Sequence, residues 1–538
     1  MSLAVVGALL LVLAGTVVAH RWGLPAPVLL PLAGIVVAVL PGVPPVRVAP
    51  DLIATVALPP LLYAATLDLT GAEMRRQRAP LAVLTTVVVV LATLAVGVVA
   101  HDLLPGVPLS AALVLGALLS ATDPVAVAAL SRGLALPRRL FTLVQAESLF
   151  NDATALVLYQ TCLAAAVTGA ALVSGHTGLS LLRAAGGGLA VGLAVAVVAR
   201  PLRRRLGDPA LATAFALLTP FVPYVVADRL GASGAVAVVV CGVALSSHTA
   251  HIAHDDPAAR VQAASVREVT VLLLEGGVFL LVGLTLPGEL RDLAASPQGL
   301  DVPRLVAQTA VLAVAVLVVR LALVVAATSL PVLRGRGGRA PWRSQLVLAW
   351  SGTRGVVALI GALSIPVATS TGGAFPGREL LVVTAGLVVL VSLVVQGLTL
   401  VPLTRSLGVA LDPAEEQGQA ALARYRTAQA GLAALETLVG GDAELPVGAV
   451  DRLRAELQDR AEQHRVAAAA AAVASRPDAE PAAGGGRAGL AELRRAVLQA
   501  ERDELLRLRR VGEVEEPVLR RVLHELDLAE AALSPRGR

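Results

Sequence analysis

Long apolar runs, separated by short polar segments, occupy the first three quarters of the chain. Each run is close to the roughly 20 residues that a helix needs to cross the hydrocarbon layer of a membrane. We count thirteen such runs, at about 2–18, 26–41, 51–69, 80–100, 107–130, 140–168, 178–199, 209–228, 232–247, 267–287, 303–330, 344–367 and 378–403. This pattern predicts an all-α, polytopic membrane protein with about 13 transmembrane helices within residues 1–410.

The pattern changes at about residue 411, where charged residues and alanine replace the long apolar runs. Leucines there recur at helical spacing, which predicts helices at about 413–438, 446–475, 487–511 and 515–533. Residues 411–538 are therefore expected to form a cytoplasmic helical domain. A regulatory role and a role in dimerisation or assembly remain open alternatives for this tail.

The arginines predict the orientation of the chain in the membrane. All 44 basic residues are arginine, and alternate loops hold most of those between the runs: 75, 76 and 78; 132, 138 and 139; 200 and 203–205; 334, 336, 339 and 343. This asymmetry is typical of cytoplasmic loops. The first run has no basic segment before it and is followed by His20 and Arg21, so we interpret it as a span, not a cleavable signal peptide. We expect a multi-pass protein of the inner (plasma) membrane, with the N-terminus outside and the C-terminus cytoplasmic.

Composition narrows the function. The chain is 56% hydrophobic, and its two cysteines, Cys162 and Cys241, both lie within apolar runs, so no disulfide framework or zinc site is indicated. The arginines flank membrane spans, which argues against nucleic acid as a partner despite the net charge of +5. There is no phosphate-binding Walker motif, so ATP is not the expected energy source. We expect a transporter without a cofactor, not an enzyme.

Two neighbouring runs carry carboxylates among apolar residues. The fifth run contains Asp123, and the sixth contains Glu147 and Asp152. An ionisable group at membrane depth is costly and by default marks an ion path or a proton relay. Pro124 cannot donate a backbone hydrogen bond and interrupts its helix, which frees carbonyl groups that suit a hard cation. We therefore predict that Asp152 and Asp123 bind a small monovalent cation that competes with a proton.

Helical spacing groups the polar residues of the sixth run into two stripes. Ser148 and Asp152 are four residues apart and share a face, and Glu147 and Asn151 form the adjacent stripe. One stripe can present a hydroxyl and a carboxylate to a cation, and the other can hold a buried structural pair. For Asp123, capping of the interrupted backbone is the alternative to ion binding.

Four stretches of the membrane region form a set of motifs: Thr122-Asp123-Pro124, Glu147-Ser-Leu-Phe-Asn-Asp152, Arg320 and Gly352-Thr-Arg-Gly355. Together they resemble the bacterial sodium/proton exchanger family, the NhaP-like branch of the monovalent cation:proton antiporters. The resemblance implies inverted repeats, a homodimer and two crossed, unwound helices. It also implies a mobile core around 107–170 and 303–403, and a dimer or scaffold part around 1–70 and 209–287.

The resemblance assigns roles residue by residue. Asp152 matches the carboxylate that binds the ion or the proton. Asp123, Ser148 and the Thr122 carbonyl match positions around the ion. Asn151 matches the asparagine of the electroneutral branch.

Further matches are structural. Glu147 and Arg320 match a buried ion pair that holds the core together. Arg354 matches the interruption of the second unwound helix, near Gly352 and Gly355. These residues are expected to shape the site without binding the ion.

The chain departs from the family pattern at two positions. Ala64 stands where relatives often carry a glutamate, so any replacement ligand must come from elsewhere, with Thr66 and Asp68 as candidates. Glu275 stands where many relatives have asparagine. It could be a second proton site or could pair with an arginine.

A histidine cluster lies in a loop that is predicted to be cytoplasmic. It comprises His248, His251 and His254. A pH sensor, an adventitious metal site and a plain solvated loop are its open interpretations.

The predicted function is electroneutral exchange of one Na⁺ for one H⁺ across the plasma membrane, by alternating access around Asp152. Asn151 does not titrate, lysine is absent, and arginine stays charged in proteins, so one titratable carboxylate is left at the centre. Li⁺ or K⁺ could be carried as well. The alternatives are a K⁺/H⁺ antiporter controlled by its tail and, from a different class, a passive cation channel.

Overall fold

The computed structural model describes residues 2–41, 50–67, 78–123, 138–169, 175–206, 208–249, 257–295, 301–329, 342–370, 372–409, 413–439, 447–470, 487–511, 513–514 and 516–531. Within these ranges every named element is a helix, and one isolated β-bridge joins Ala368 and Ala374. This confirms the all-α class. The loop histidines 251 and 254 lie outside the described residues, as do Asp68, Pro124 and the side chain of His248.

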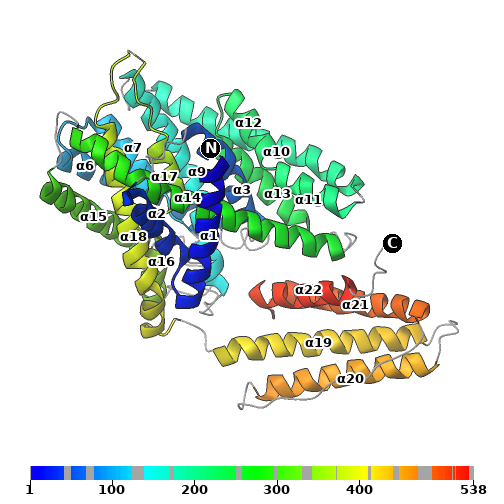
Figure 1. Ribbon diagram of the computed structural model, residues 1–538. Coiled ribbons are helices and arrows are strands. Elements are labelled where there is room, and N and C mark those ends of the chain that lie inside the picture. The colour runs from blue at the N-terminus through cyan, green and yellow to red at the C-terminus, as the bar shows by residue number, and fades with distance from the viewer. Residues whose placement is uncertain are drawn as a thin grey trace.

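The first part of the chain forms one large bundle of helices (Figure 1). In chain order its elements are α1 (Ser2–Trp22), α2 (Ala26–Val39), α3 (Pro50–Leu67), α5 (Arg78–Ala82), the π-helical η1 (Val83–Val87), α6 (Val88–Leu103), α7 (Leu109–Ser120), α9 (Arg138–Thr168), α10 (Gly175–Arg205), α11 (Pro209–Leu218), α12 (Phe221–Arg229), α13 (Gly234–Thr249), α14 (Pro257–Ala295), α15 (Val302–Ser329), α16 (Trp342–Trp350), α17 (Val356–Leu363) and α18 (Arg378–Ser406).

Many of these helices have the length and apolarity of membrane spans. Six stretches of the described chain are long enough to cross a bilayer: Ala79–Leu103, Leu179–Arg203, Ala210–Arg229, Gln262–Ala295, Val302–Ser329 and Arg378–Ser406. Shorter apolar helices accompany them: Val6–Trp22, Ala26–Val39, Ile53–Leu67, Leu109–Ser120 and Gly234–Ser246. The chain is thus a multi-pass membrane protein, and the count of thirteen spans stays a prediction.

Helix α14 is the central element of the bundle. It is 39 residues long, and it packs against α1, α2, α3, α11, α17 and α18. The main hydrophobic core draws on most of the surrounding helices and includes buried Phe279 of α14 and Leu118 of α7. This packing fixes α14 beside the two helices that are interrupted within the bundle.

The interruptions lie where the sequence places polar or glycine residues inside apolar runs. Helix α7 ends at Ser120 and is followed by non-helical residues up to Asp123. The second interruption separates α16 from α17, between Trp350 and Val356. The continuation of the first run beyond Asp123 lies outside the described residues.

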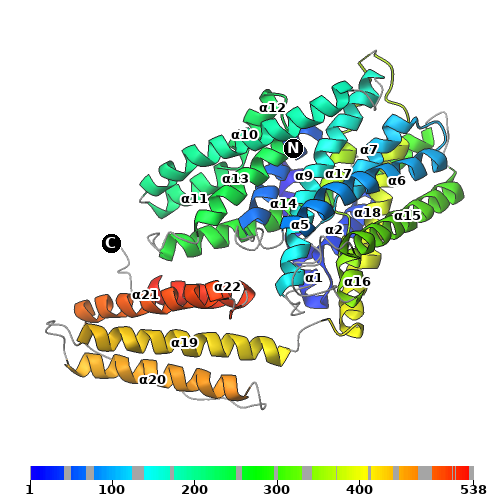
Figure 2. The ribbon, with the colours of Figure 1, turned by 180° about the vertical axis from the view of Figure 1, so that it is seen from behind.

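Four further helices form a separate bundle beside the membrane domain: α19 (Pro413–Val439), α20 (Val447–Ala470), α21 (Arg487–Val511) and α22 (Glu516–Ala531). Figure 2 shows them from behind. Buried leucines such as Leu505, Leu508 and Leu519 join α19, α21 and α22. Ion pairs between Arg424 and Glu525, at 2.6 Å, and between Arg502 and Asp527 hold α22 onto its neighbours.

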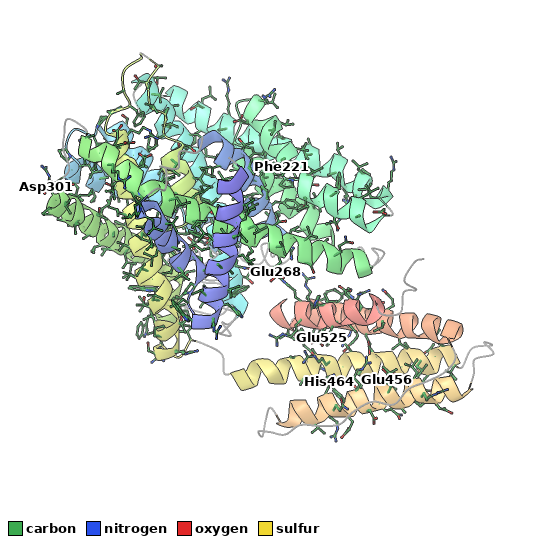
Figure 3. The ribbon with its side chains drawn as sticks, viewed as in Figure 1. Phe221, Glu268, Asp301, Glu456, His464 and Glu525 are labelled. Carbon is green, nitrogen blue, oxygen red and sulfur yellow. The ribbon has the colours of Figure 1, made fainter. Side chains whose placement is uncertain are left out.

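The tail also touches the membrane domain. Helix α22 packs against α14, and the end of α14 that bears Glu268 lies beside α22, which bears Glu525 (Figure 3). His524 of α22 lines the same cavity as Glu268. The tail is therefore in contact with α14, the central helix of the membrane domain.

One carboxylate is enclosed inside the tail bundle. Glu501 of α21 is 1% exposed, and its Oε1 lies 3.7 Å from Nη1 of Arg460 on α20. Among the described residues, its Oε2 has no hydrogen-bond partner. Burial raises the pKa of Glu501 to about 7, against the smaller opposing effect of Arg460.

This raised pKa predicts a pH-dependent tail. The folded tail holds the Glu501 proton more tightly than the unfolded chain does. The stability that this proton gives to the folded tail is therefore fully present below the ordinary carboxyl pKa. It is lost as pH rises through about 7. We expect hydrogen exchange of α21 in the full-length protein, corrected for the intrinsic pH effect, to show protection weakening by up to about 3 kcal/mol between pH 5 and pH 8.

Two variants test whether Glu501 causes the pH dependence of the tail. Glu501→Gln should remove most of the pH dependence, whereas Glu504→Gln, on the same helix but paired near the surface with Arg507, should leave it in place. Equal pH dependence in wild type and Glu501→Gln would contradict the assignment.

Candidate ion-binding site

The two non-helical segments, at residues 121–123 and 351–355, are hydrogen-bonded to each other. The backbone N–H of Asp123 donates to the Thr353 carbonyl at 2.7 Å, and the Thr353 hydroxyl donates to the Asp123 carbonyl at 3.2 Å. The Val356 N–H, at the start of α17, donates to Oδ2 of Asp123 at 3.2 Å. Asp123 therefore caps an orphan donor at the N-terminus of α17, which belongs to the other interrupted segment.

Glycine is required in the second non-helical segment because side chains approach its backbone closely. A Cβ on Gly355 would lie 1.6 Å from Oδ2 of Asp123, and a Cβ on Gly352 would lie 1.9 Å from Nε of Arg320. Neither space can hold a methyl group. The two glycines of the Gly-Thr-Arg-Gly motif thus admit a carboxylate on one side and a guanidinium on the other.

Arg354 satisfies the end of the first interrupted helix. Its Nη1 donates to the carbonyls of Ser120 and Ala121 at 3.2 and 3.0 Å. These carbonyls belong to the C-terminal end of α7, where a cation is favourable. Arg354 is 2% exposed, so its charge acts on these carbonyls from within the protein.

A hydrogen-bond network that was not predicted from the sequence holds the backbone of Arg354 in place. The Arg354 N–H donates to the Ser392 hydroxyl at 3.0 Å, and that hydroxyl donates to Oε1 of Gln396. The Gln396 amide donates in turn to the Trp350 carbonyl at 2.9 Å. Ser392 and Gln396 are polar, four residues apart and within an apolar run, which is the signal that identified Ser148 and Asp152.

Helix α9 brings the predicted polar stripe to the first interruption. The Thr122 hydroxyl donates to the Ser148 hydroxyl at 3.2 Å, and the Asn151 amide donates to the Thr122 hydroxyl at 3.0 Å. Asp152 is 5% exposed, and among the described residues its Oδ1 has no hydrogen-bond partner. A buried carboxylate oxygen without a donor is suited to accept a cation or a proton.

The adjacent stripe holds the predicted ion pair. Both carboxylate oxygens of Glu147 accept from the Arg320 guanidinium at 2.9 Å, and the two residues are 1% and 3% exposed. Arg320 also donates to the Ala349 carbonyl at 3.0 Å. The pair therefore links α9, α15 and the last turn of α16, and the Asn151 amide joins it to Thr122 through a 3.3 Å contact with Glu147.

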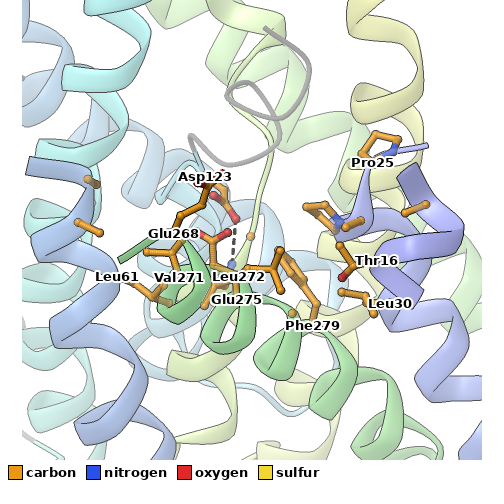
Figure 4. A pocket seen from close by; sticks show the side chains of 18 of the residues that line it. Thr16, Pro25, Leu30, Leu61, Asp123, Glu268, Val271, Leu272, Glu275 and Phe279 are labelled. Atoms are coloured by element: carbon orange, nitrogen blue, oxygen red, sulfur yellow. Dashed lines mark hydrogen bonds between the residues drawn. The ribbon is translucent and has the colours of Figure 1, made fainter. Parts of the chain in front are cut away.

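A large cavity connects this region with the side of the tail. Its volume is about 1480 Å³, and its lining includes Asp123 and Asp152, Arg267 and Glu268 of α14, and His524 of the tail helix α22. Figure 4 shows Glu268 and Glu275 on α14, below Asp123. Hydrated ions can therefore approach the two aspartates from the side of the tail.

The structure also places the residues at which the chain departs from the family pattern. Ala64 and Glu275 both line the cavity. Thr66 is not among the lining residues, because its hydroxyl donates to the Tyr63 carbonyl at 2.6 Å and its side chain packs against Gly242 of α13. Thr66 is thus a poor replacement for the ligand that Ala64 lacks.

Comparisons with known proteins agree with the motifs. A sequence profile described as "Sodium/hydrogen exchanger, transmembrane" matches residues 8–406. An uncharacterised Na⁺/H⁺ exchanger of Mycobacterium tuberculosis is 32% identical over 97% of this chain and 94% of its own length. The Na⁺/H⁺ antiporter NhaP of Pseudomonas aeruginosa is 31% identical over 66% of this chain and 81% of its own.

The fold is likewise similar to that of a solved structure. The sodium proton antiporter MjNhaP1 from Methanocaldococcus jannaschii at pH 8 superimposes with a TM-score of 0.60, covering 76% of this chain and 99% of that one. The sequence identity is 19%, so this similarity concerns the fold alone.

Loss of Glu147 is expected to destabilise the protein. Glu147→Ala leaves the Arg320 charge buried without its carboxylate, and breaking a buried pair in this way costs about 3–5 kcal/mol. We expect a clearly lowered unfolding temperature of the purified protein. The double variant Glu147→Leu, Arg320→Met removes both charges and should be less destabilised than Glu147→Ala; the opposite order would contradict the pairing.

Proposed function

Because the chain belongs to the sodium/hydrogen exchanger family, we propose that it exchanges Na⁺ for H⁺ across the plasma membrane, with Asp152 as the shared binding group. We propose that Asp123, Ser148, Thr122 and Asn151 complete the site; Ser148 and Asn151 are both hydrogen-bonded to Thr122. The proposal rests on one observation above all: Asp152 is buried, lines the cavity and has a carboxylate oxygen without a hydrogen-bond partner among the described residues.

The coupling follows from the cost of moving charge through a low-dielectric region. A bare Asp152 carboxylate is expensive to carry past the apolar part of the bundle, whereas a carboxylate neutralised by Na⁺ or H⁺ is not. The two ions exclude each other at one group. Alternating exposure of the site to the two sides then exchanges one ion for the other.

The contacts support a site that is open to the cytoplasm in this conformation. The cavity reaches from Asp152 to the side of the tail, which the arginine distribution predicts to be cytoplasmic. Toward the other end of α14, Glu289 pairs with Arg378 of α18 at 3.6 Å. Arg378 also donates to the Ile365 carbonyl at 2.9 Å, and these contacts join α14 and α18 away from the cavity mouth.

Asn151 supports a one-for-one stoichiometry. It does not titrate, and its amide is bonded to Thr122 and Glu147. The buried arginines Arg320 and Arg354 are bonded to a carboxylate and to carbonyls. Asp123 caps α17 and Glu147 pairs with Arg320, so we propose Asp152 as the one central carboxylate that exchanges a proton, which favours exchange without net charge movement.

A broader cation range is the second candidate. A Bacillus subtilis relative, 32% identical over 44% of this chain and 36% of its own, is named a sodium, potassium, lithium and rubidium/H⁺ antiporter. We therefore include K⁺ and Li⁺ as candidate substrates, with control by the tail that contacts α14. We also expect a homodimer, as the motifs imply.

Asp152→Asn tests the assignment directly. In liposomes with an imposed pH gradient, wild type should move protons when Na⁺, Li⁺ or K⁺ is added, and Asp152→Asn should fall to the level of protein-free liposomes. The asparagine keeps the shape of the side chain, so the variant should elute and unfold like wild type. Retained Na⁺-dependent proton movement would refute the role of Asp152.

Electroneutrality predicts that voltage does not drive the exchange. With Na⁺ and H⁺ gradients fixed, a membrane potential of either sign, imposed with a permeant lipophilic ion instead of K⁺, should leave the initial rate of Na⁺-driven proton flux unchanged. A rate that follows the potential would show net charge movement, and Na⁺ conductance without coupled proton flux would identify a channel.

A further inference from the structure

Helix α14 exposes a stripe of side chains to the cavity. The stripe follows helical spacing from Ala264 to Phe279, and its charged members are Arg267, Glu268 and Glu275. The inner part of this stripe is apolar apart from Glu275. The cavity wall is thus mostly hydrophobic where it approaches the aspartates, and one α14 carboxylate is set into it.

Glu275 lies well inside the helix, away from the mouth. It follows Glu268 by seven residues, which is two turns and about 10 Å along the helix. Glu268 is exposed, and Glu275 is partly buried. Figure 4 places both on the same side of α14, with Asp123 above them.

The position of the Glu275 carboxylate indicates a role in the ion path. Partly buried charges in a membrane domain are costly and face water-filled cavities or ion paths. A cation that enters from the mouth travels along this wall before it reaches Asp152. Its hydration shell can be exchanged for carboxylate oxygens, which a hard cation accepts.

We propose that Glu275 is a second cation-binding carboxylate, which holds the incoming ion in the inner cavity before transfer to Asp152. This inference rests on the proposed function. Its role is to raise the local concentration of the cation beside the site through a short-range attraction in a region of low dielectric. The α3 wall of the same cavity contributes Ala64 and Ala65, which have no oxygen-bearing side chains.

Removal of this carboxylate should weaken ion capture more than turnover. In Glu275→Gln we expect the apparent KM for Na⁺ to rise roughly tenfold, equivalent to about 1.4 kcal/mol of lost attraction, with kcat within about twofold of wild type. Glu275→Asp keeps the charge and should restore most of the affinity. The measurement is Na⁺-dependent proton flux of the full-length protein in liposomes.

Glu268→Gln is the matched control, because it removes the same charge from the same helix face two turns nearer the mouth. A general surface-potential effect would be shared by both variants and would fade at high concentrations of an impermeant salt, since exposed charges are screened. A binding role predicts that only the Glu275→Gln effect persists at high salt.

Three results would overturn the inference: an unchanged KM in Glu275→Gln, an equal and salt-sensitive effect in both variants, or a lost kcat with an unchanged KM. If Glu275→Gln unfolds, Glu275→Asn against Glu275→Asp gives the same comparison. Failure of the proposed function is distinguishable, because wild type itself would then show no Na⁺-dependent proton flux.

Discussion

Backbone groups in a membrane interior must find partners within the protein, and this constraint shapes the centre of the molecule. A helix that stops at membrane depth leaves N–H and C=O groups with no water to bond. Here two helices stop beside each other, and the backbones of Asp123 and Thr353 exchange hydrogen bonds. Arg354 covers the carbonyls that remain at the end of α7. Each interruption therefore supplies hydrogen-bond partners for backbone groups that the other leaves without them.

The same contacts distinguish charged groups that already have partners within the protein from the one proposed to bind the ion. Arg320 has two carboxylate oxygens and a backbone carbonyl around it. Asp123 has a helix N-terminus against its carboxylate. Asp152, equally enclosed, keeps an oxygen with no donor among the described residues. Its neighbours are held in place by other contacts, so a cation would meet a site that needs little reorganisation.

Much of this arrangement could be predicted because it is local in sequence. Hydrophobic runs located the helices, and the four-residue spacing of Ser148 and Asp152 put a hydroxyl and a carboxylate on one face. The bond between Glu147 and Arg320 spans 173 positions, and periodicity cannot pair residues so far apart, so only the resemblance to a family suggested it. The hydrogen bond from the backbone of Arg354 to Ser392 was not predicted, because the position of a polar residue in an apolar run does not identify its partner. Thr66 is close to Ala64 in sequence, but residues two apart on a helix point in different directions.

The length of α14 explains how one helix serves both the site and the tail. Its 39 residues extend about 58 Å at 1.5 Å per residue, nearly twice the roughly 30 Å of the hydrocarbon layer. Its first turns can therefore stand outside the membrane and contact α22, while Glu275 lies about 27 Å further along the helix. Because the helix is continuous between these points, the charges at the mouth and the carboxylate within the cavity are held at a fixed separation. A shift of α14 caused by the tail would consequently move Glu268 and Glu275 together relative to Asp152.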